Sequence, residues 1–269
     1  MQRVLITGAA GRIGSVLRDG LRGVYPVLRL TDRAPLGAAR DREELYPADL
    51  CDLDAVMAIM EGVDAVVHLG GIPEEDTWER IHDNNIVGTY HVFEAARHAG
   101  VKRVVFASTN HVVGYYRRSR QVGPDAPPRP DSRYAVSKLF GEGLGRLYAD
   151  KHGIGCVCLR IGSFQAEPRD LRMLSTWISH PDTARLVRRA LDAPGVHFEI
   201  VYGVSANDRN WWDNPGAARI GYAPQDNAED HAEAILATMA PNDEPENEGP
   251  FHGGAFCGME VTADLDEID

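Results

Sequence analysis

The sequence is poor in positive charge, and lysine is its scarcest charged residue. Lysine occurs only at Lys102, Lys138 and Lys151, and 40 acidic residues against 28 basic ones give a formal net charge of −12. Nucleic-acid binding calls for a basic surface that neutralises phosphates, so this composition argues against a nucleic-acid partner. The excess of carboxylates is typical either of a protein from a high-salt cytoplasm or of an ordinary acidic enzyme, and the sequence does not choose between them.

Paired cysteines and long apolar runs are also missing. The four cysteines show no CxxC spacing and no accompanying histidines, so we expect reduced thiols, a cytoplasmic location and no metal site. No apolar stretch is long enough to cross a bilayer, which predicts no membrane partner. The opening residues enter a strand-like run and a glycine turn at once, and this is not the layout of a signal peptide.

What the sequence does contain is an alternation of strand-like and helix-like segments. Apolar runs typical of strands lie at residues 3–7, 26–30, 65–69, 103–107 and 156–161, and helical spacing lies at 13–21, 55–60, 77–99 and 132–152. Gly100 and Gly153 follow the last two helices as favoured helix stops. Strands that alternate with helices pair in parallel and are covered on both faces. The chain of 269 residues is therefore predicted to form one α/β core, a doubly wound parallel sheet.

A glycine-rich turn joins the first strand to the first helix. Gly8, Gly11 and Gly14 form a GxxGxxG pattern where the backbone must turn sharply and approach a pyrophosphate closely. The helix that begins at Arg12 and Ile13 offers its N–H groups and the positive end of its dipole to the phosphates. This context predicts a Rossmann fold that binds a dinucleotide.

An acidic residue at the end of the second strand selects the dinucleotide. Asp32 follows Gly14 by eighteen positions, close to the spacing expected for a carboxylate that accepts hydrogen bonds from ribose hydroxyls. A carboxylate also repels a 2′-phosphate, so we predict NAD as the cofactor. Arg12 and Arg33 are a counter-indication, because either could pair with that phosphate and allow some use of NADP.

Two further loops are expected around the same cofactor. Asp49 and Leu50 follow a strand-like stretch and are predicted to meet the adenine. The third strand ends at Leu69, Gly70 and Gly71, where glycines again let the backbone approach the dinucleotide.

The regular alternation loosens after Gly162. Helical spacing recurs at 171–177, 183–193 and 228–239, a strand-like run lies at 198–202, and an acidic, turn-rich loop lies at 242–248. We therefore expect a single domain spanning residues 1–269. Residues 1–162 are expected to form the NAD-binding core, and residues 163–269 a small C-terminal lobe that mainly binds the substrate.

Tyr134 and Lys138 lie four positions apart at the start of the helix predicted at 132–152. Residues with this spacing share one helix face, and an ammonium beside a phenol favours the phenolate, which lowers the pKa of the tyrosine. Tyr134 is then a usable general base near neutral pH, and Lys138 can also hold the nicotinamide ribose. The preceding strand ends in Ser108 and Thr109, whose hydroxyls are expected at the same edge of the sheet.

These motifs together resemble the extended short-chain dehydrogenase/reductase family from the N-terminus to about Gly162. The resemblance adds Asn85 and Ile161 to the residues expected at the cofactor. It implies that Thr109 supplies the hydroxyl of a catalytic triad with the tyrosine and the lysine, where many relatives carry serine, and Ser108 is the alternative. Relatives often associate through the helices that correspond to 77–99 and 132–152, which implies a homo-oligomer.

A narrower resemblance extends over nearly the whole chain. Uronate dehydrogenases carry similar versions of FASTNHVVGYY (106–116), RIGS (160–163), RMLSTW (172–177), SAND (205–208), WWDN (211–214) and GGAF (253–256). The resemblance implies oxidation of the uronates glucuronate or galacturonate at C1, with NAD as acceptor and an aldarolactone as product. Pro73 departs from the pattern, because a small polar residue is expected there beside the sugar.

The same resemblance implies a role for each group around the sugar. Arg172 binds the C6 carboxylate as a bidentate fork, because guanidinium geometry matches a carboxylate, and Ser163 adds a hydroxyl. Asn110 and His111 hold ring hydroxyls, and Thr109 hydrogen-bonds the reacting oxygen, whose proton the catalytic tyrosine removes. Loss of hydride from C1 to NAD turns the ring hemiacetal into a lactone without a water molecule.

Two other functions stay open at this point. A nucleotide-sugar epimerase or dehydratase shares these motifs but needs a larger lobe for its nucleoside diphosphate, and only about a hundred residues follow Gly162. An NAD(H)-sensing regulator would keep the glycine loop but would not need Tyr134 and Lys138. The sequence also does not choose between glucuronate and galacturonate, nor does it define the reacting anomer or the lactone ring size.

Overall fold

A computed structural model describes residues 1–238 and 249–268, and within them seven strands form one sheet. The strand order is β3-β2-β1-β4-β5-β6-β9, and each neighbouring pair runs parallel. The strands are β1 (Arg3–Thr7), β2 (Val27–Thr31), β3 (Glu43–Leu45), β4 (Ala65–His68), β5 (Arg103–Thr109), β6 (Gly155–Ile161) and β9 (Phe198–Gly203). The order reverses direction between β1 and β4, the switch point of a doubly wound sheet. The predicted α/β fold is confirmed.

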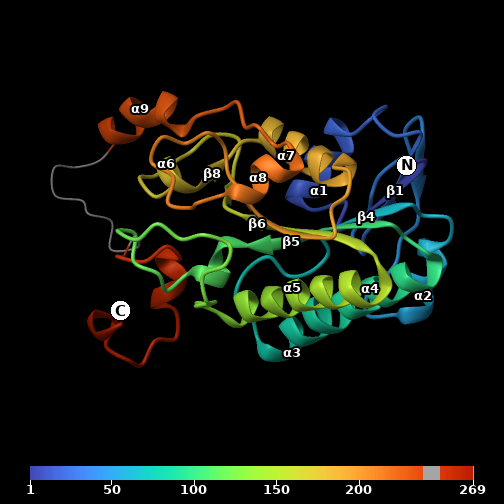
Figure 1. Cartoon of the computed structure of the whole chain (residues 1–269), viewed down its shortest axis with the longest axis horizontal. Coiled ribbons are helices and arrows are strands. Elements are labelled where there is room, and N and C mark those ends of the chain that lie inside the picture. Colours follow the sequence, from blue (N-terminus) through green and yellow to red (C-terminus); the bar gives the residue numbers. More distant parts are fainter. Residues whose placement is uncertain (239–248, 269) are drawn as a thin grey trace.

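Helices cover both faces of this sheet (Figure 1). One face carries α1 (Arg12–Gly20), α7 (His180–Asp192) and α8 (Pro215–Ile220), and the other carries α2 (Leu53–Met60), α4 (Gly88–Ala99) and α5 (Arg133–His152). Both α4 and α5 end as predicted, at Gly100 and Gly153, which adopt left-handed conformations (φ 70° and 67°). The helix predicted at 77–99 consists of α3 (Trp78–Ile81), a π-helical turn (His82–Val87) and α4.

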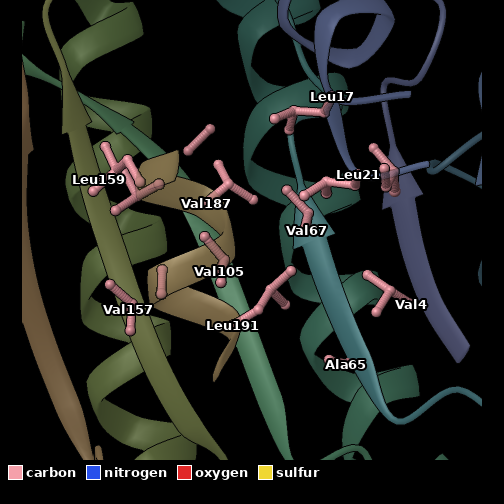
Figure 2. Close-up of a cluster of buried hydrophobic side chains, with 14 of the residues drawn as sticks. Val4, Leu17, Leu21, Ala65, Val67, Val105, Val157, Leu159, Val187 and Leu191 are labelled. Atoms are coloured by element: carbon pink, nitrogen blue, oxygen red, sulfur yellow. The ribbon is translucent and has the colours of Figure 1, made fainter. Parts of the chain in front are cut away.

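The central strands of the sheet are buried on both faces, and most of their residues are apolar. Val4 and Ile6 of β1 pack with α1 and α7, whereas Leu5 between them packs with α2 and α4. Figure 2 shows the first of these clusters, in which Val67 of β4 and Leu191 of α7 take part. Burial of each such side chain contributes about 1.5–3 kcal/mol. These two clusters therefore fix the strands and the positions of their carboxyl ends.

The chain after Gly162 contributes to the sheet as well as to a smaller layer. β9 and α7 complete the main sheet and its cover, although both come from the part predicted as the lobe. The smaller layer contains a two-stranded parallel sheet and two short helices: β7 (Ser163–Phe164), β8 (Trp177–Ile178), α6 (Met173–Thr176) and α9 (Ala232–Ala237).

The elements predicted after Gly162 differ in part from those in the structure. The helix predicted at 171–177 is shorter than expected, because Trp177 has an extended backbone and enters β8. The loop predicted at 242–248 and the end of the predicted helix at Met239 lie outside the described residues. Among the described residues, no helix combines the length and the apolar character that crossing a membrane requires.

Candidate active site

The carboxyl ends of β1, β2, β4, β5 and β6 open onto one cavity of about 700 Å³. This volume lies within the range of ordinary cofactor and ligand sites. Its wall contains every predicted site residue except one: Gly8, Gly11, Arg12, Ile13, Gly14, Asp32, Asp49, Leu50, Leu69, Gly70, Gly71, Thr109, Asn110, His111, Tyr134, Lys138, Ile161, Ser163 and Arg172. The topology of the sheet thus gathers segments that are far apart in the sequence.

The glycine loop is packed too closely for side chains. A Cβ atom on Gly14 would lie 2.3 Å from the carbonyl oxygen of Gly8, and one on Gly70 would lie 2.4 Å from a methyl carbon of Leu50. Gly8 also has a left-handed backbone (φ 66°), which side chains disfavour. The result is a backbone-lined cradle at the N-terminus of α1, as a pyrophosphate requires.

Asp32 is held at the end of β2 by the backbone. Its Oδ2 accepts a hydrogen bond from the N–H of Ala10 (2.9 Å), and its Oδ1 accepts one from the N–H of Ala34 (2.9 Å). The carboxylate therefore faces the cavity in a fixed orientation and keeps lone pairs for ribose hydroxyls. Arg33, the counter-indication in the sequence, lies 3.7 Å from the carboxylate of Asp49, so part of its charge is already balanced.

Asn85 is the exception among the predicted residues. Its side-chain nitrogen donates to the carbonyl oxygen of Ile72 and to Oγ of Ser137 (both 3.0 Å), and its Oδ1 accepts from the N–H of Ile72 (2.7 Å). These bonds use the amide inside the protein, and Asn85 does not line the cavity. The structure therefore places Asn85 behind the loop that follows Gly71, where it holds the loop against α5.

Tyr134 and Lys138 are both buried on the face of α5 that meets the cavity. Nζ of Lys138 lies 5.7 Å from the centroid of the Tyr134 ring and 5.2 Å from that of Phe106. Burial raises the pKa of Tyr134 to about 12, and a hydrogen bond with Thr109 offsets only part of that increase. Burial also lowers the pKa of Lys138 to about 8. The pKa of Tyr134 is thus raised, and not lowered as the expected effect of Lys138 would require, because burial penalises the phenolate.

Thr109 and Ser108 have different surroundings. The Thr109 hydroxyl accepts from the N–H of His111 (3.3 Å) and hydrogen-bonds Tyr134. The Ser108 hydroxyl instead donates to Glu142 (2.6 Å), whose carboxylate forms a buried ion pair with Arg160 (2.9 Å). The geometry therefore places Thr109, and not the alternative Ser108, beside the phenol.

Arg172 is anchored so that its guanidinium stays at the cavity wall. Nε and Nη2 donate to the carbonyl oxygen of His252 (3.0 and 2.8 Å), and Nη1 donates to Oγ of Ser163 (3.1 Å). The side-chain nitrogen of Asn110 donates to the carbonyl oxygen of Ile161 (3.0 Å), and its side-chain oxygen accepts from Nη2 of Arg172 (2.8 Å). Burial lowers the pKa of Arg172, and an anion beside the guanidinium would offset this cost of desolvation.

Ser163 and Asn110 therefore act on the arginine. The Thr176 hydroxyl donates to the backbone oxygen of Arg172 (3.1 Å), so Ser163 must donate to Thr176 (2.8 Å) and can only accept from the guanidinium. Ser163 and Asn110, both predicted to contact the substrate, thus each hydrogen-bond the guanidinium of Arg172 and one further group of the protein.

Two residues that contact His111 were not predicted from the sequence: Phe256, which lines the cavity, and Asp131, which lies behind it. Phe256 stacks on His111 with ring centroids 4.1 Å apart, and Asp131 holds the Nδ1 atom of His111 at 2.6 Å. Phe256 lies in a segment already quoted for the resemblance, which was an available signal, whereas nothing in the sequence marked Asp131. Pro73 does line the cavity. Residues 1–238 and 249–268 contain no cluster of three or more His, Cys, Asp or Glu that could bind a metal.

Comparison with protein families matches residues 4–195 to the NAD dependent epimerase/dehydratase family. Among individual proteins, the chain is similar to the uronate dehydrogenase of Pseudomonas putida, with 48% identity over 257 residues that cover 95% of each chain.

Solved structures give the same picture. A mutant of the uronate dehydrogenase from Agrobacterium tumefaciens, complexed with NAD, has 45% identity and a TM-score of 0.93, and the match covers 98% of this chain and 100% of that one. The glucuronic acid dehydrogenase from Chromohalobacter salexigens has 41% identity and a TM-score of 0.92 over 99% of each chain. The similarity therefore includes both the cofactor part and the part after Gly162.

Proposed function

Because the chain belongs to the NAD dependent epimerase/dehydratase family, we propose that it is an NAD-dependent uronate dehydrogenase. It oxidises a hexuronate, D-glucuronate or D-galacturonate, at C1 to the aldarolactone. The observation that carries this proposal is the anchored, buried guanidinium of Arg172 in the same cavity as Tyr134 and Lys138. The resemblance to uronate dehydrogenases inferred from the sequence is confirmed by relatives of this class at 46–48% identity.

The cavity fits NAD at its glycine-lined end. A pyrophosphate would lie on the cradle of Gly8, Gly11 and Gly14, where Cβ atoms added to Gly8 or Gly14 would collide with backbone. Asp32 would accept hydrogen bonds from the adenosine ribose, and its negative charge disfavours a 2′-phosphate. NAD, when bound, supplies the acceptor for the hydride that leaves C1.

The sugar end of the cavity provides the anion site and the hydrogen-bonding groups. Arg172 would bind the C6 carboxylate, with Ser163 and Asn110 holding the guanidinium in place. The same cavity wall contains Thr109 and Tyr134, which would face C1 of the bound sugar. An uncharged sugar such as glucose lacks the carboxylate and cannot form an ion pair with this guanidinium, so it should bind poorly.

The proton of the C1 hydroxyl passes to Tyr134. Thr109 would hydrogen-bond the reacting oxygen beside the phenol, and the ammonium of Lys138, 5.7 Å from the centroid of the Tyr134 ring, would favour the phenolate as the proton is transferred. Arg172 thus binds the substrate, Tyr134 accepts the proton, and Lys138 stabilises the negative charge of the phenolate.

The first experiment follows reduced nicotinamide by its absorbance with purified protein, NAD and glucuronate, galacturonate or glucose. We expect NADH formation with a uronate and not with glucose. Arg172→Ala should lose at least about 100-fold in kcat/KM for the uronate, since removing one partner of a buried charge pair costs about 3–5 kcal/mol. The matched control is Arg169→Ala, an exposed arginine nearby that does not line the cavity.

Other outcomes point elsewhere. If intact protein binds NAD but oxidises no uronate, the proposal is wrong. Activity with a UDP-sugar would then indicate an epimerase or dehydratase, and NAD binding without any turnover would indicate a sensor.

We further propose a homo-oligomer that works in the cytoplasm, with residues 1–162 holding NAD and 163–269 serving mainly the sugar. The described cysteines are free thiols, which supports a reducing compartment. Exposed apolar side chains on α4 and α5, namely Tyr90, Val136 and Leu147, support an interface there. Sedimentation velocity measures the assembly directly.

A further inference from the structure

His111 and Asp131 form a tight pair beside the sugar end of the cavity. Nδ1 of His111 lies 2.6 Å from Oδ2 of Asp131, whose side chain has no exposed surface, whereas the side chain of His111 is 15% exposed. His111 lines the cavity and Asp131 does not. The carboxylate therefore lies behind the histidine and outside the cavity wall, so His111 is the member of the pair that can contact a substrate.

The space around Asp131 is built for a carboxylate. A Cβ atom on either Gly114 or Gly253 would lie 2.0 Å from Oδ2, so both positions must be glycine for the carboxylate to fit. Its other oxygen, Oδ1, accepts a hydrogen bond from the hydroxyl of Ser132 (2.8 Å). A buried carboxylate is costly unless each oxygen has a partner, and here His111 and Ser132 supply them.

This pairing determines which nitrogen of His111 carries the proton. An ionised carboxylate only accepts hydrogen bonds, so Nδ1 must donate and hold the hydrogen in the neutral ring. Nε2 is then left with a lone pair and is an acceptor. Phe256 stacks on the same ring at 4.1 Å with an angle of 25° between the planes, which fixes the orientation of the imidazole. The His111 and Tyr134 rings form a T-shaped pair, with centroids 6.2 Å apart and an angle of 66° between their planes.

We propose that Asp131 is a positioning residue that keeps His111 in its Nδ1–H tautomer, so that Nε2 accepts a hydrogen bond from a ring hydroxyl of the sugar. This inference rests on the proposed uronate dehydrogenase function. With Nε2 as a fixed acceptor, His111 recognises the hydroxyl on the ring carbon that faces it. A sugar with a hydrogen or a methoxy group at this carbon has no hydroxyl proton to donate and should bind less well.

The central variant is Asp131→Asn. It keeps the size that Gly114 and Gly253 allow, but an amide can donate as well as accept, so it no longer selects one tautomer. We expect kcat/KM for the uronate to fall about tenfold, the value of one hydrogen bond, with the change mainly in KM and little in kcat. The Kd for NAD should not change. Nitrogen NMR of His111 should show the Nδ1–H tautomer in the wild type and a mixture in the variant.

A matched control is available on the surface. Asp150 pairs with Nε2 of His197 at 2.7 Å, and both side chains are exposed and away from the cavity. Asp150→Asn removes the same kind of contact and should leave KM and kcat unchanged. A similar loss in this variant would mean that the tenfold effect has no specific connection to His111, and would overturn the proposal.

A double-mutant cycle separates positioning from a structural role. If Asp131 acts through His111, then Asp131→Asn should add no further loss in a His111→Ala background. An equal loss in both backgrounds would overturn the proposal while leaving the uronate activity established. If the wild type oxidises no uronate, the proposed function fails and NMR alone decides: an unchanged His111 tautomer in Asp131→Asn overturns the inference, and a mixture supports the positioning role.

Discussion

At the scale of single residues, burial works against the charged forms of Tyr134, Lys138 and Arg172. It raises the pKa of Tyr134 to about 12, lowers that of Lys138 to about 8, and lowers that of Arg172. A carboxylate beside the guanidinium would stabilise the charge of Arg172. The same desolvation that makes these charges costly also strengthens their interactions with a charged substrate or a developing phenolate.

Tyr134→Phe tests the assignment of the base. The change removes the proton acceptor but keeps the ring, so kcat should fall by about 10²–10⁴-fold while NAD still binds. Steady-state kinetics and an NAD titration measure the two effects. Tyr46→Phe, at a phenol outside the cavity wall, is the control and should retain full activity. Retention of activity by Tyr134→Phe would instead assign the proton transfer to another group.

At the scale of the elements, α5 carries the catalytic pair and must lie very close to β5. A Cβ atom on Gly141 would come within 2.2 Å of the ring of Phe106, the ring over which Lys138 lies. Gly141 is thus the residue that lets the helix approach the strand. Gly143, on the exposed side of the same helix, has no atom within 4 Å of an added Cβ.

These two glycines provide a matched pair of variants. Gly141→Ala overpacks the helix against the strand, so the free energy of unfolding should fall by about 1–3 kcal/mol and kcat/KM should fall as Lys138 is displaced. Gly143→Ala should raise the free energy of unfolding by up to about 1 kcal/mol, because alanine favours a helix over glycine. Urea unfolding measures both. Equal behaviour of the two variants would contradict the close packing.

At the scale of the whole molecule, a buried histidine links stability to pH. His68 at the end of β4 hydrogen-bonds Thr7 (2.8 Å) through Nδ1 and Thr89 (3.2 Å) through Nε2. Burial, followed by repulsion from Lys138, lowers the pKa of His68 from 6.5 to about 3. The imidazole therefore stays neutral inside the fold, where it joins β1, β4 and α4.

The sign of the pH effect follows from this lowered pKa. Between pH 6.5 and about 3 the unfolded chain binds a proton at His68 that the native protein does not, so stability is complete above pH 6.5 and falls on acidification. The loss should approach about 1.4 kcal/mol per pH unit for this one group. Urea unfolding at a series of pH values measures it. His68→Gln should be less stable at neutral pH yet show a shallower pH slope, and an unchanged slope would refute this origin.

The sequence by itself determined the layers of the fold and most of the cofactor site. β1, β4, β5 and β6 are apolar on both faces, which only a sheet covered on both sides can bury, and local glycines end α4 and α5. The glycine loop and Asp32 could be predicted because backbone geometry and charge at fixed local spacing specify them. Such features depend on neighbours along the chain.

Only the tertiary structure decided the features that depend on distant neighbours. β3 is three residues long and polar, and it forms because β2 offers it an edge, with ion pairs from Arg18 and Arg29 to its glutamates. Asn85 turns inward because Ile72 and Ser137 satisfy its amide. Asp131 and Phe256 reach His111 from separate segments, and burial sets the pKa of Tyr134. Pairing, desolvation and side-chain partners arise only when the chain packs, so no local pattern could reveal them.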